Sequence, residues 1–351
     1  MSVLVLGGYG AVGAHLVRLL RAHSIPVLAA GRDAARADRV VDVAAMDSFT
    51  TALTGVSIVV NCAGVEDVRL AQECTRRGVV FVEISATSDY VQALQHVEGP
   101  VVLGVGLAPG LTTLLAVDAL SGDPGPVDIM IGLGSGEHHG PAATAWTHRL
   151  MGQHFADPGG AIVRNFTKPA HFTIPEQAGY QPFPALRADF ADQHRLTHEY
   201  AVPVRAYLRL DSRLATTGLA ALTWAPALRA LAPRRMPGSD RWVVLARPTN
   251  GPIRWATGRG QSLATAAVAA TTVREVARRP FSAPTWIHEL LEIGTLRHDL
   301  SAAGIRLRYP PRPTSPPGSA IRKRCCGWTS DCAVYLRSAS AEGQCDRRRH
   351  R

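Results

Sequence analysis

The first hundred residues alternate between short apolar runs and segments whose apolar side chains recur at helical spacing. Residues 3–6 (VLVL) form a continuous apolar run, which is typical of a parallel strand covered on both faces. In residues 11–22 apolar side chains recur with the period of a helix, and Arg18 falls on the opposite face. A second strand is expected at residues 26–30, so the chain opens as strand, helix, strand.

The same alternation continues to residue 105. The expected elements are strands at residues 40–43, 57–61, 79–84 and 101–105, and helices at residues 46–53, 68–77 and 90–95. Strands that alternate with helices at this spacing are joined by right-handed crossovers and form a parallel sheet. We therefore predict an α/β fold with a Rossmann-type, doubly wound parallel sheet.

After about Pro124 the pattern changes. Candidate strands at residues 127–133, 205–210 and 242–245 are separated by long stretches of mixed character, and helices are expected at residues 261–278 and 286–291. A chain of 351 residues is long enough for two domains, because single cores stop growing at about 250 to 300 residues. We expect a second α/β domain.

Charge and cysteine are concentrated at the C-terminus. From Tyr309 onward nine Lys or Arg stand against three acidic residues, so this tail carries +6 of the formal charge of +10. The nearly neutral remainder argues against nucleic-acid binding, which needs a basic face. Four of the six cysteines also lie in the tail, without the paired spacing of a metal site, so no metal is expected.

The composition of the tail, rich in Pro, Ser and Arg, predicts disorder or indicates an altered reading frame. At the other end, Met1 leads almost directly into a strand, with no charged segment before an apolar one. We therefore expect a reducing, cytoplasmic location.

One uncharged, fairly apolar stretch lies at residues 214–228. It is 15 residues long and contains Gly218 and Pro226, whereas a membrane-crossing helix needs about 20 apolar residues. A buried or interfacial helix is the favoured interpretation, and contact with a membrane surface is the less favoured alternative.

A glycine-rich turn joins the first strand to the first helix. Its sequence contains Gly8-x-Gly10-x-x-Gly13 and also Gly7 three residues before Gly10. Such glycines permit a tight turn, let the backbone approach a pyrophosphate, and let helix and strand pack closely. The free amides of the helix N-terminus then meet the phosphate charge.

The end of the second strand selects between NAD and NADP. An acidic side chain there binds the ribose 2′-hydroxyl, whereas this chain has Gly31-Arg32. An arginine can pair with a 2′-phosphate and stack on adenine. We expect NADP, and Asp33 keeps NAD as the weaker alternative.

Two further strand ends complete the expected cofactor site. Asp42 and Val43 end the third predicted strand, where a carboxylate and an apolar side chain commonly flank adenine. Asn61, Cys62, Ala63 and Gly64 end the fourth, where small residues let the backbone pass beside the ribose and nicotinamide. Cys62 is interpreted as a small packing residue rather than a catalytic thiol.

Five segments occur in a characteristic order: VLVLGGYGAVG, AGRD, VVNCAG, LAQECTRRGVVFVEISA and VVLGVGLAPGLTTLLAVDAL. In this order they resemble the saccharopine dehydrogenase family. Two later segments resemble the closing helices of that family, TGRGQSLATAAVAA and PTWIHELLEIGTLRHDLSAAGI. The resemblance covers most of residues 1–307. It implies an NADP-dependent oxidoreductase in which Gly7, Gly8, Tyr9, Gly10, Ala11, Val12 and Gly13 bind the pyrophosphate, Arg32 the 2′-phosphate, and residues 61–64 the nicotinamide side.

The resemblance also implies a division of the chain. Residues 1–123 form the NAD(P)-binding domain, and residues 124–258 a central α/β domain for substrate binding and dimerisation. Residues 259–308 are C-terminal helices that return to the first domain, and residues 309–351 are the basic tail. A homodimer acting on a small or lipid-like substrate is expected.

The catalytic residues are less evident. Glu83, where the family often has Asp, is the candidate proton handler, and a structural carboxylate is the alternative reading. His138, in Glu137-His138-His139 after a predicted strand, is a candidate titrating imidazole.

Two other functions remain open. A non-catalytic NADP-binding sensor or accessory subunit would explain the lack of an obvious proton donor. An atypical short-chain reductase would share the glycine turn, but no tyrosine here has a lysine four residues later, and that class needs the pair.

Overall fold

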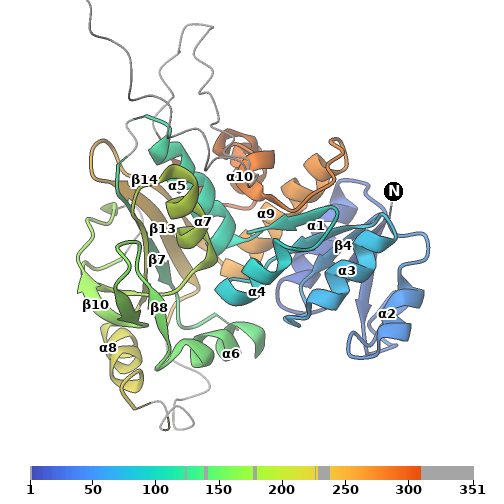
Figure 1. Cartoon of the computed structure of the whole chain (residues 1–351), viewed down its shortest axis with the longest axis horizontal. Coiled ribbons are helices and arrows are strands. Elements are labelled where there is room, and N and C mark those ends of the chain that lie inside the picture. Colours follow the sequence, from blue (N-terminus) through green and yellow to red (C-terminus); the bar gives the residue numbers. More distant parts are fainter. Residues whose placement is uncertain are drawn as a thin grey trace, which may run out of the picture. The chain divides into compact units, whose positions relative to one another are not determined.

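The computed structural model describes residues 2–122, 125–137, 141–176, 180–225, 227 and 238–309. These residues contain two large sheets and the helices that pack on them. Figure 1 shows the blue strands of the first sheet on the right and the green and brown strands of the second on the left.

The first sheet is parallel throughout its described pairings and has the strand order β15-β6-β5-β4-β1-β2-β3. Its strands are β1 (Val3–Leu6), β2 (Val27–Gly31), β3 (Arg39–Val40), β4 (Ile58–Asn61), β5 (Val80–Glu83), β6 (Val101–Leu103) and β15 (Thr285–Trp286). The chain order reverses on either side of β1, as in a doubly wound sheet. The predicted fold class is confirmed.

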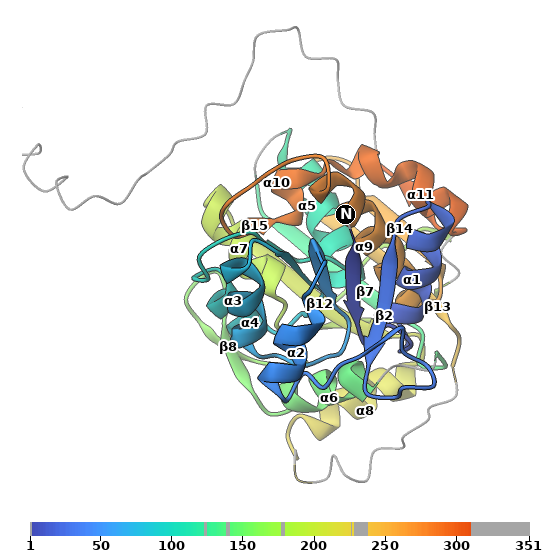
Figure 2. The same cartoon turned by 90° about the vertical axis from the view of Figure 1, so that its right-hand side faces the viewer.

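Helices cover both faces of this sheet because its strands are apolar on both sides. In β1, Val3 and Val5 face the helices α1 (Gly13–Ala22) and α9 (Gln261–Val276). Leu4 and Leu6 face the opposite layer, formed by α2 (Met46–Ala52), α3 (Val68–Arg76) and α4 (Ser88–Leu94). Figure 2 shows α1 on one side of the strands and α3 and α4 on the other.

The second sheet is mixed and has the order β10-β11-β12-β7-β13-β14-β16. Its strands are β7 (Val127–Leu133), β10 (Thr167–Ala170), β11 (Ala185–Arg187), β12 (Val204–Leu210), β13 (Arg241–Pro248), β14 (Arg254–Arg259) and β16 (Arg306–Arg308), and β8 (His154–Ala156) pairs separately with β9 (Ile162–Arg164). Among the described pairings of this sheet, only that of β7 with β12 is parallel.

The remaining helices are α5 (Thr112–Leu120), α6 (Pro141–Leu150), α7 (Ala191–Tyr200), α8 (Arg213–Leu222), α10 (Ile287–Leu290) and α11 (Arg297–Ala302). Leu114 and Leu115 of α5 pack with the second sheet and with α9 in one apolar cluster. The C-terminal segment touches both sheets, since β15 pairs with β6 and β16 pairs with β14. None of the described helices is long and apolar enough to cross a membrane.

Candidate nucleotide and substrate cleft

The glycine turn after β1 is closed so tightly that Gly7, Gly8 and Gly13 leave no room for a side chain. Gly7 has a positive φ of 68°, and a Cβ there would lie 2.8 Å from the carbonyl oxygen of Cys62. A Cβ on Gly13 would lie 2.2 Å from the carbonyl oxygen of Gly7. The turn is therefore drawn against the end of β4 and against the first turn of α1, as the glycine spacing predicted.

Helix α1 begins without a capping side chain. Its N-cap residue is Val12, which makes no side-chain hydrogen bond to the helix. The first amides of an α-helix have no partner within the helix, so this terminus is suited to an anion. Tyr9, Gly10, Ala11 and Val12 line the cleft at this point.

A large cleft of about 1520 Å³ runs from this turn along the carboxyl ends of the first sheet. Twelve of the fourteen predicted cofactor residues line it: Gly7, Tyr9, Gly10, Ala11, Val12, Arg32, Asp42, Val43, Asn61, Cys62, Ala63 and Gly64. The exceptions are Gly8 and Gly13, which serve close packing instead. A Cβ on Gly8 would lie 2.6 Å from the Cα of Ala29.

The carboxylates of Asp33 and Asp42 each accept a hydrogen bond within their own loop. Asp33 accepts a hydrogen bond from the amide of Ala35 at 3.0 Å, and Asp42 accepts one from the amide of Ala44 at 3.0 Å. Arg32 is exposed and lines the cleft, whereas Asp33 does not line it. The prediction that Asp42 and Val43 end the third strand is wrong, because β3 ends at Val40; both residues lie in the following turn.

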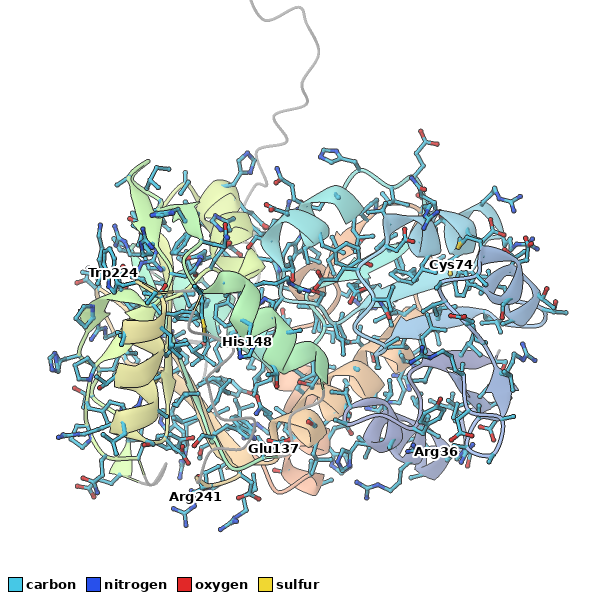
Figure 3. The ribbon with its side chains drawn as sticks, turned by 90° about the horizontal axis from the view of Figure 1, so that it is seen from below. Arg36, Cys74, Glu137, His148, Trp224 and Arg241 are labelled. Carbon is cyan, nitrogen blue, oxygen red and sulfur yellow. The ribbon has the colours of Figure 1, made fainter. Side chains whose placement is uncertain are left out.

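Tyr9 is held by neighbours that the sequence did not reveal. Its hydroxyl accepts a hydrogen bond from the amide of Asp33 at 3.0 Å. The guanidinium of Arg36 lies 4.4 Å from the centre of the ring and donates to the Tyr9 carbonyl at 3.0 Å. These contacts fix the glycine turn to the loop after β2, and Figure 3 shows Arg36 at the outer edge of this half of the molecule.

A buried polar cluster lies where β4 and β5 end. The amide nitrogen of Asn61 donates to the carbonyl of Val65 at 2.9 Å and to Oε2 of Glu83 at 2.7 Å. Glu83 also accepts from the Tyr90 hydroxyl at 3.0 Å and from the backbone amide of Ser85 at 2.7 Å. Asn61 therefore anchors the turn that follows β4 and joins it to Glu83.

Burial raises the pKa of Glu83 to about 7, against the hydrogen bonds from Asn61, Ser85 and Tyr90, which lower it. The side chain is 2% exposed and lines the cleft. A carboxyl group that titrates near neutrality can both hold and release a proton at physiological pH.

A second polar cluster joins the first sheet to α6. Oε1 of Glu66 accepts hydrogen bonds from the hydroxyls of Ser85 at 2.9 Å and Thr87 at 2.6 Å. Arg149 of α6 donates to the same oxygen at 2.9 Å and to the Thr87 hydroxyl at 3.1 Å. These bonds tie α6 across the cleft to the strand ends, and His148 of α6 lies between the two halves in Figure 3.

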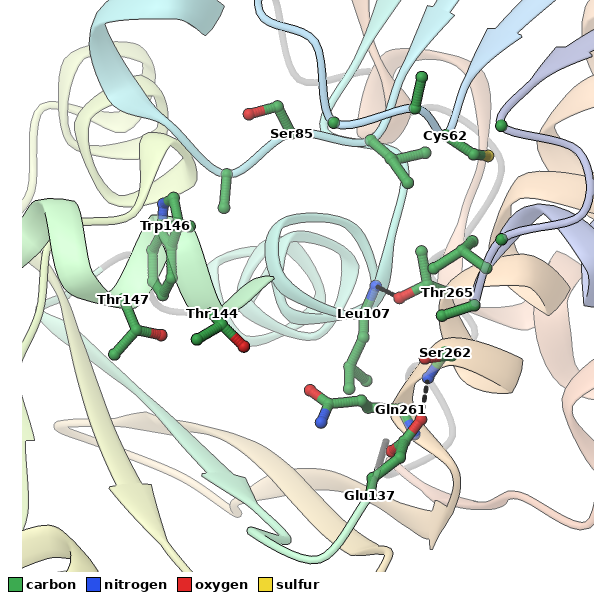
Figure 4. A pocket seen from close by; sticks show the side chains of 18 of the residues that line it. Cys62, Ser85, Leu107, Glu137, Thr144, Trp146, Thr147, Gln261, Ser262 and Thr265 are labelled. Carbon is green, nitrogen blue, oxygen red and sulfur yellow. Dashed lines mark hydrogen bonds between the residues drawn. The ribbon is translucent and has the colours of Figure 1, made fainter. Parts of the chain in front are cut away.

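Glu137 provides the cap of α9. Its carboxylate accepts from the backbone amides of Gln261 at 2.6 Å and Ser262 at 3.0 Å. Figure 4 shows this contact, with Trp146 on another side of the same cleft. The loop after β7 is thereby attached to the helix that packs on α1.

The first five strands of the first sheet lie in a segment that is similar to a known family of proteins. Residues 3–93 match the model of the NAD dependent epimerase/dehydratase family. These residues form a Rossmann-type nucleotide-binding unit.

Several solved structures are similar to this chain at low identity. The UDP-N-acetylglucosamine 4-epimerase from Bacillus cereus is 20% identical over 25% of this chain and 42% of the epimerase, with a TM-score of 0.21. A dihydrodipicolinate reductase from Paenisporosarcina sp. TG-14 is 11% identical over 83% of this chain and 99% of its own, with a TM-score of 0.39. The WlbA (WbpB) dehydrogenase from Thermus thermophilus is 10% identical over 86% and 93%, with a TM-score of 0.39.

The aligned part of this chain spans less than half of the epimerase. The search of curated protein sequences gave no match.

Cys62, within the nucleotide-binding unit, is unsuited to nucleophilic catalysis. Burial raises the pKa of the Cys62 thiol, and the nearby Glu83 raises it further. The thiol therefore stays protonated near neutral pH, as expected of a packing residue.

His138, the other catalytic candidate, lies outside the described residues. Within the described ranges, no group of three or more His, Cys, Asp or Glu side chains is placed to hold a metal ion.

Several residues that shape the cleft could not be predicted from the sequence. Tyr90 of α4 donates a hydrogen bond to Glu83, and Arg149 of α6 donates one to Glu66. No sequence motif connects the members of either pair. Glu66 had a weak signal, because it follows the Asn61–Gly64 turn by two residues. Trp146 lines the cleft beside Phe190, with the two ring centres 4.9 Å apart.

Proposed function

We propose that the chain is an NADP-dependent oxidoreductase of saccharopine dehydrogenase-like type. The observation that carries this proposal is a single cleft with two different walls. One wall is the glycine turn and the strand ends of the nucleotide-binding unit, and the other is formed by the second sheet, α6 and α8. A dinucleotide on the first wall leaves space for a second molecule between the sheets.

The residues present fit a nicotinamide dinucleotide. Because Gly7 carries no side chain, the backbone of the turn is open to the cleft. The start of α1 has no capping side chain, so its free amides suit the pyrophosphate. Arg32 is available for a 2′-phosphate, while the carboxylate of Asp33 is bound to its own loop. This arrangement favours NADP over NAD. Residues 61–64 would lie beside the nicotinamide.

The proposed hydride transfer depends on the side chains that would lie beside the nicotinamide. NADPH, when bound, supplies a hydride from C4 of its nicotinamide. The chain must position the substrate opposite that carbon and manage the accompanying proton. Glu83 is our candidate for holding this proton, since its carboxyl lines the cleft and its pKa is raised to about 7.

A titration of NADPH and NADH tests the cofactor assignment. Arg32→Ala is expected to weaken NADPH binding about ten- to a hundredfold, the roughly 1 to 3 kcal/mol of a charge-assisted contact, and to leave NADH binding nearly unchanged. Arg18→Ala is the matched control, because Arg18 is an exposed arginine on α1 that does not line the cleft. Equal losses for both nucleotides would remove the argument for phosphate selection.

Oxidation of NADPH in the presence of a panel of carbonyl and imine compounds tests for catalysis. Turnover with any of them supports the oxidoreductase. Binding of NADPH without oxidation across the panel would favour the non-catalytic sensor instead.

A further inference from the structure

The cleft continues well beyond the nucleotide wall. Its volume of about 1520 Å³ exceeds the roughly 300 to 1,000 Å³ of a typical ligand pocket. The continuation lies against strands β7 and β12 of the second sheet and against helices α6 and α8. We call this continuation the far chamber.

The floor of the far chamber is an apolar stripe on two parallel strands. Ile131 and Leu133 of β7 line it, together with Leu208 and Leu210 of β12. Ile131 pairs with Leu208 and Leu133 with Leu210, and alternate residues of a strand share a face. Four branched aliphatic side chains therefore form one continuous surface.

The wall formed by α8 is apolar over the same length. The residues of α8 that line the cleft are Leu214, Ala215, Gly218, Leu219 and Leu222. Their spacing places them on one face of the helix. A Cβ added to Gly218, in the middle of this face, would meet no atom within 4 Å, so the wall is recessed there.

Three of the four elements around the far chamber are uncharged where they line it. Among the described lining residues, β7, β12 and α8 contribute no charged side chain, and Arg149 of α6 is bound to Glu66. Glu137 is bound by the amides of α9. An amino or carboxylate group placed against β7, β12 and α8 would therefore lose its hydration without gaining a charged partner on these elements.

We propose that the far chamber binds the aliphatic chain of the substrate, so that the substrate is a molecule with a long apolar tail. This proposal rests on the proposed function, because the reacting end of that molecule would face the nicotinamide. Each methylene that leaves water for an apolar surface contributes to affinity. Longer chains should accordingly bind more tightly until the chamber is filled.

The test uses cis-parinaric acid, a fluorescent fatty acid, on the full-length chain. Binding of one probe per chain is expected, with 1-dodecanol displacing it at a concentration at least tenfold lower than 1-octanol. Gly218→Trp, which fills the recess, is expected to weaken probe binding at least tenfold and to change the Kd for NADPH less than twofold.

Ala221→Trp is the matched control, because Ala221 lies on the same helix, is exposed and does not line the cleft. It should leave both affinities unchanged. Ala215→Trp, on the lining face, repeats the test if Gly218→Trp does not fold.

Lack of probe binding, or equal binding by the lining-face and control variants, would overturn the proposal for the far chamber. The two proposals fail separately. Loss of the parinarate signal with intact NADPH binding removes only the aliphatic-chain substrate, whereas no NADPH binding with intact parinarate binding removes only the oxidoreductase.

Discussion

Replacing Glu83 with Gln removes a buried group whose titration is coupled to folding. Burial raises the pKa of this carboxyl from its ordinary 4.5 to about 7. The folded chain therefore holds the proton more tightly than the unfolded chain does. The resulting contribution to stability is complete below about pH 4.5 and is lost as the pH rises through about 7.

The size of this effect follows from the pKa difference. A rise from 4.5 to about 7 corresponds to about 3 kcal/mol, since one unit of pKa is worth about 1.4 kcal/mol. Gln lacks this pH dependence. Gln also keeps only one acceptor oxygen, so it cannot accept from both the Ser85 backbone amide and the Asn61 side chain, which costs about 1 to 3 kcal/mol at every pH.

Urea unfolding of the wild type and of Glu83→Gln, from about pH 4 to pH 8.5, separates the two effects. The free energy of unfolding of the wild type, relative to the variant, should fall by about 3 kcal/mol across this range. Glu98→Gln, at an exposed position, is the control and should change by less than about 0.5 kcal/mol. If the Glu83 difference stays flat, the pKa of Glu83 in the folded chain equals its ordinary 4.5 and its place as a proton carrier falls.

Two further variants test the framework of the site. Gly13→Ala places a Cβ only 2.2 Å from the carbonyl oxygen of Gly7. We expect NADPH titration to show lost binding and thermal unfolding to show a lower Tm. An unchanged Kd for NADPH would contradict the tight turn. Glu137→Ala removes the acceptor for the amides of Gln261 and Ser262 and should lower the free energy of unfolding in urea by about 1 kcal/mol. Unchanged stability would show that α9 does not depend on this cap.

The first sheet could be predicted from the sequence because its signals are local. Residues 3–6 are apolar on both faces, and the glycine turn follows immediately, so neighbouring residues alone indicate strand and turn. The strand β3 was placed less well, since it has only two residues, Arg39 and Val40. Its end is set by pairing with β2 rather than by its own side chains.

The second sheet was predicted only in part because several of its strands bury arginines. Arg187 of β11 pairs with Asp157, and Arg254 of β14 pairs with Asp118. Both arginines are buried, at 2% and 8% exposure, and neither strand was predicted. Hydrophobic patterns treat arginine as a surface residue, and the partners that make burial possible are distant in sequence.

The cleft shows the same division between local and distant information. Arg32 and Asn61 follow apolar strands directly, so their place at the sheet edge could be inferred from order alone. A buried or interfacial helix was predicted within residues 214–228, and α8 spans Arg213–Leu222, but the sequence did not show which surface Gly218 and its neighbours face. That surface depends on the pairing of β7 with β12, which brings together residues 77 positions apart, such as Ile131 and Leu208. The glycine-turn end of the cleft is thus encoded by short motifs, whereas the far chamber depends on packing between distant segments.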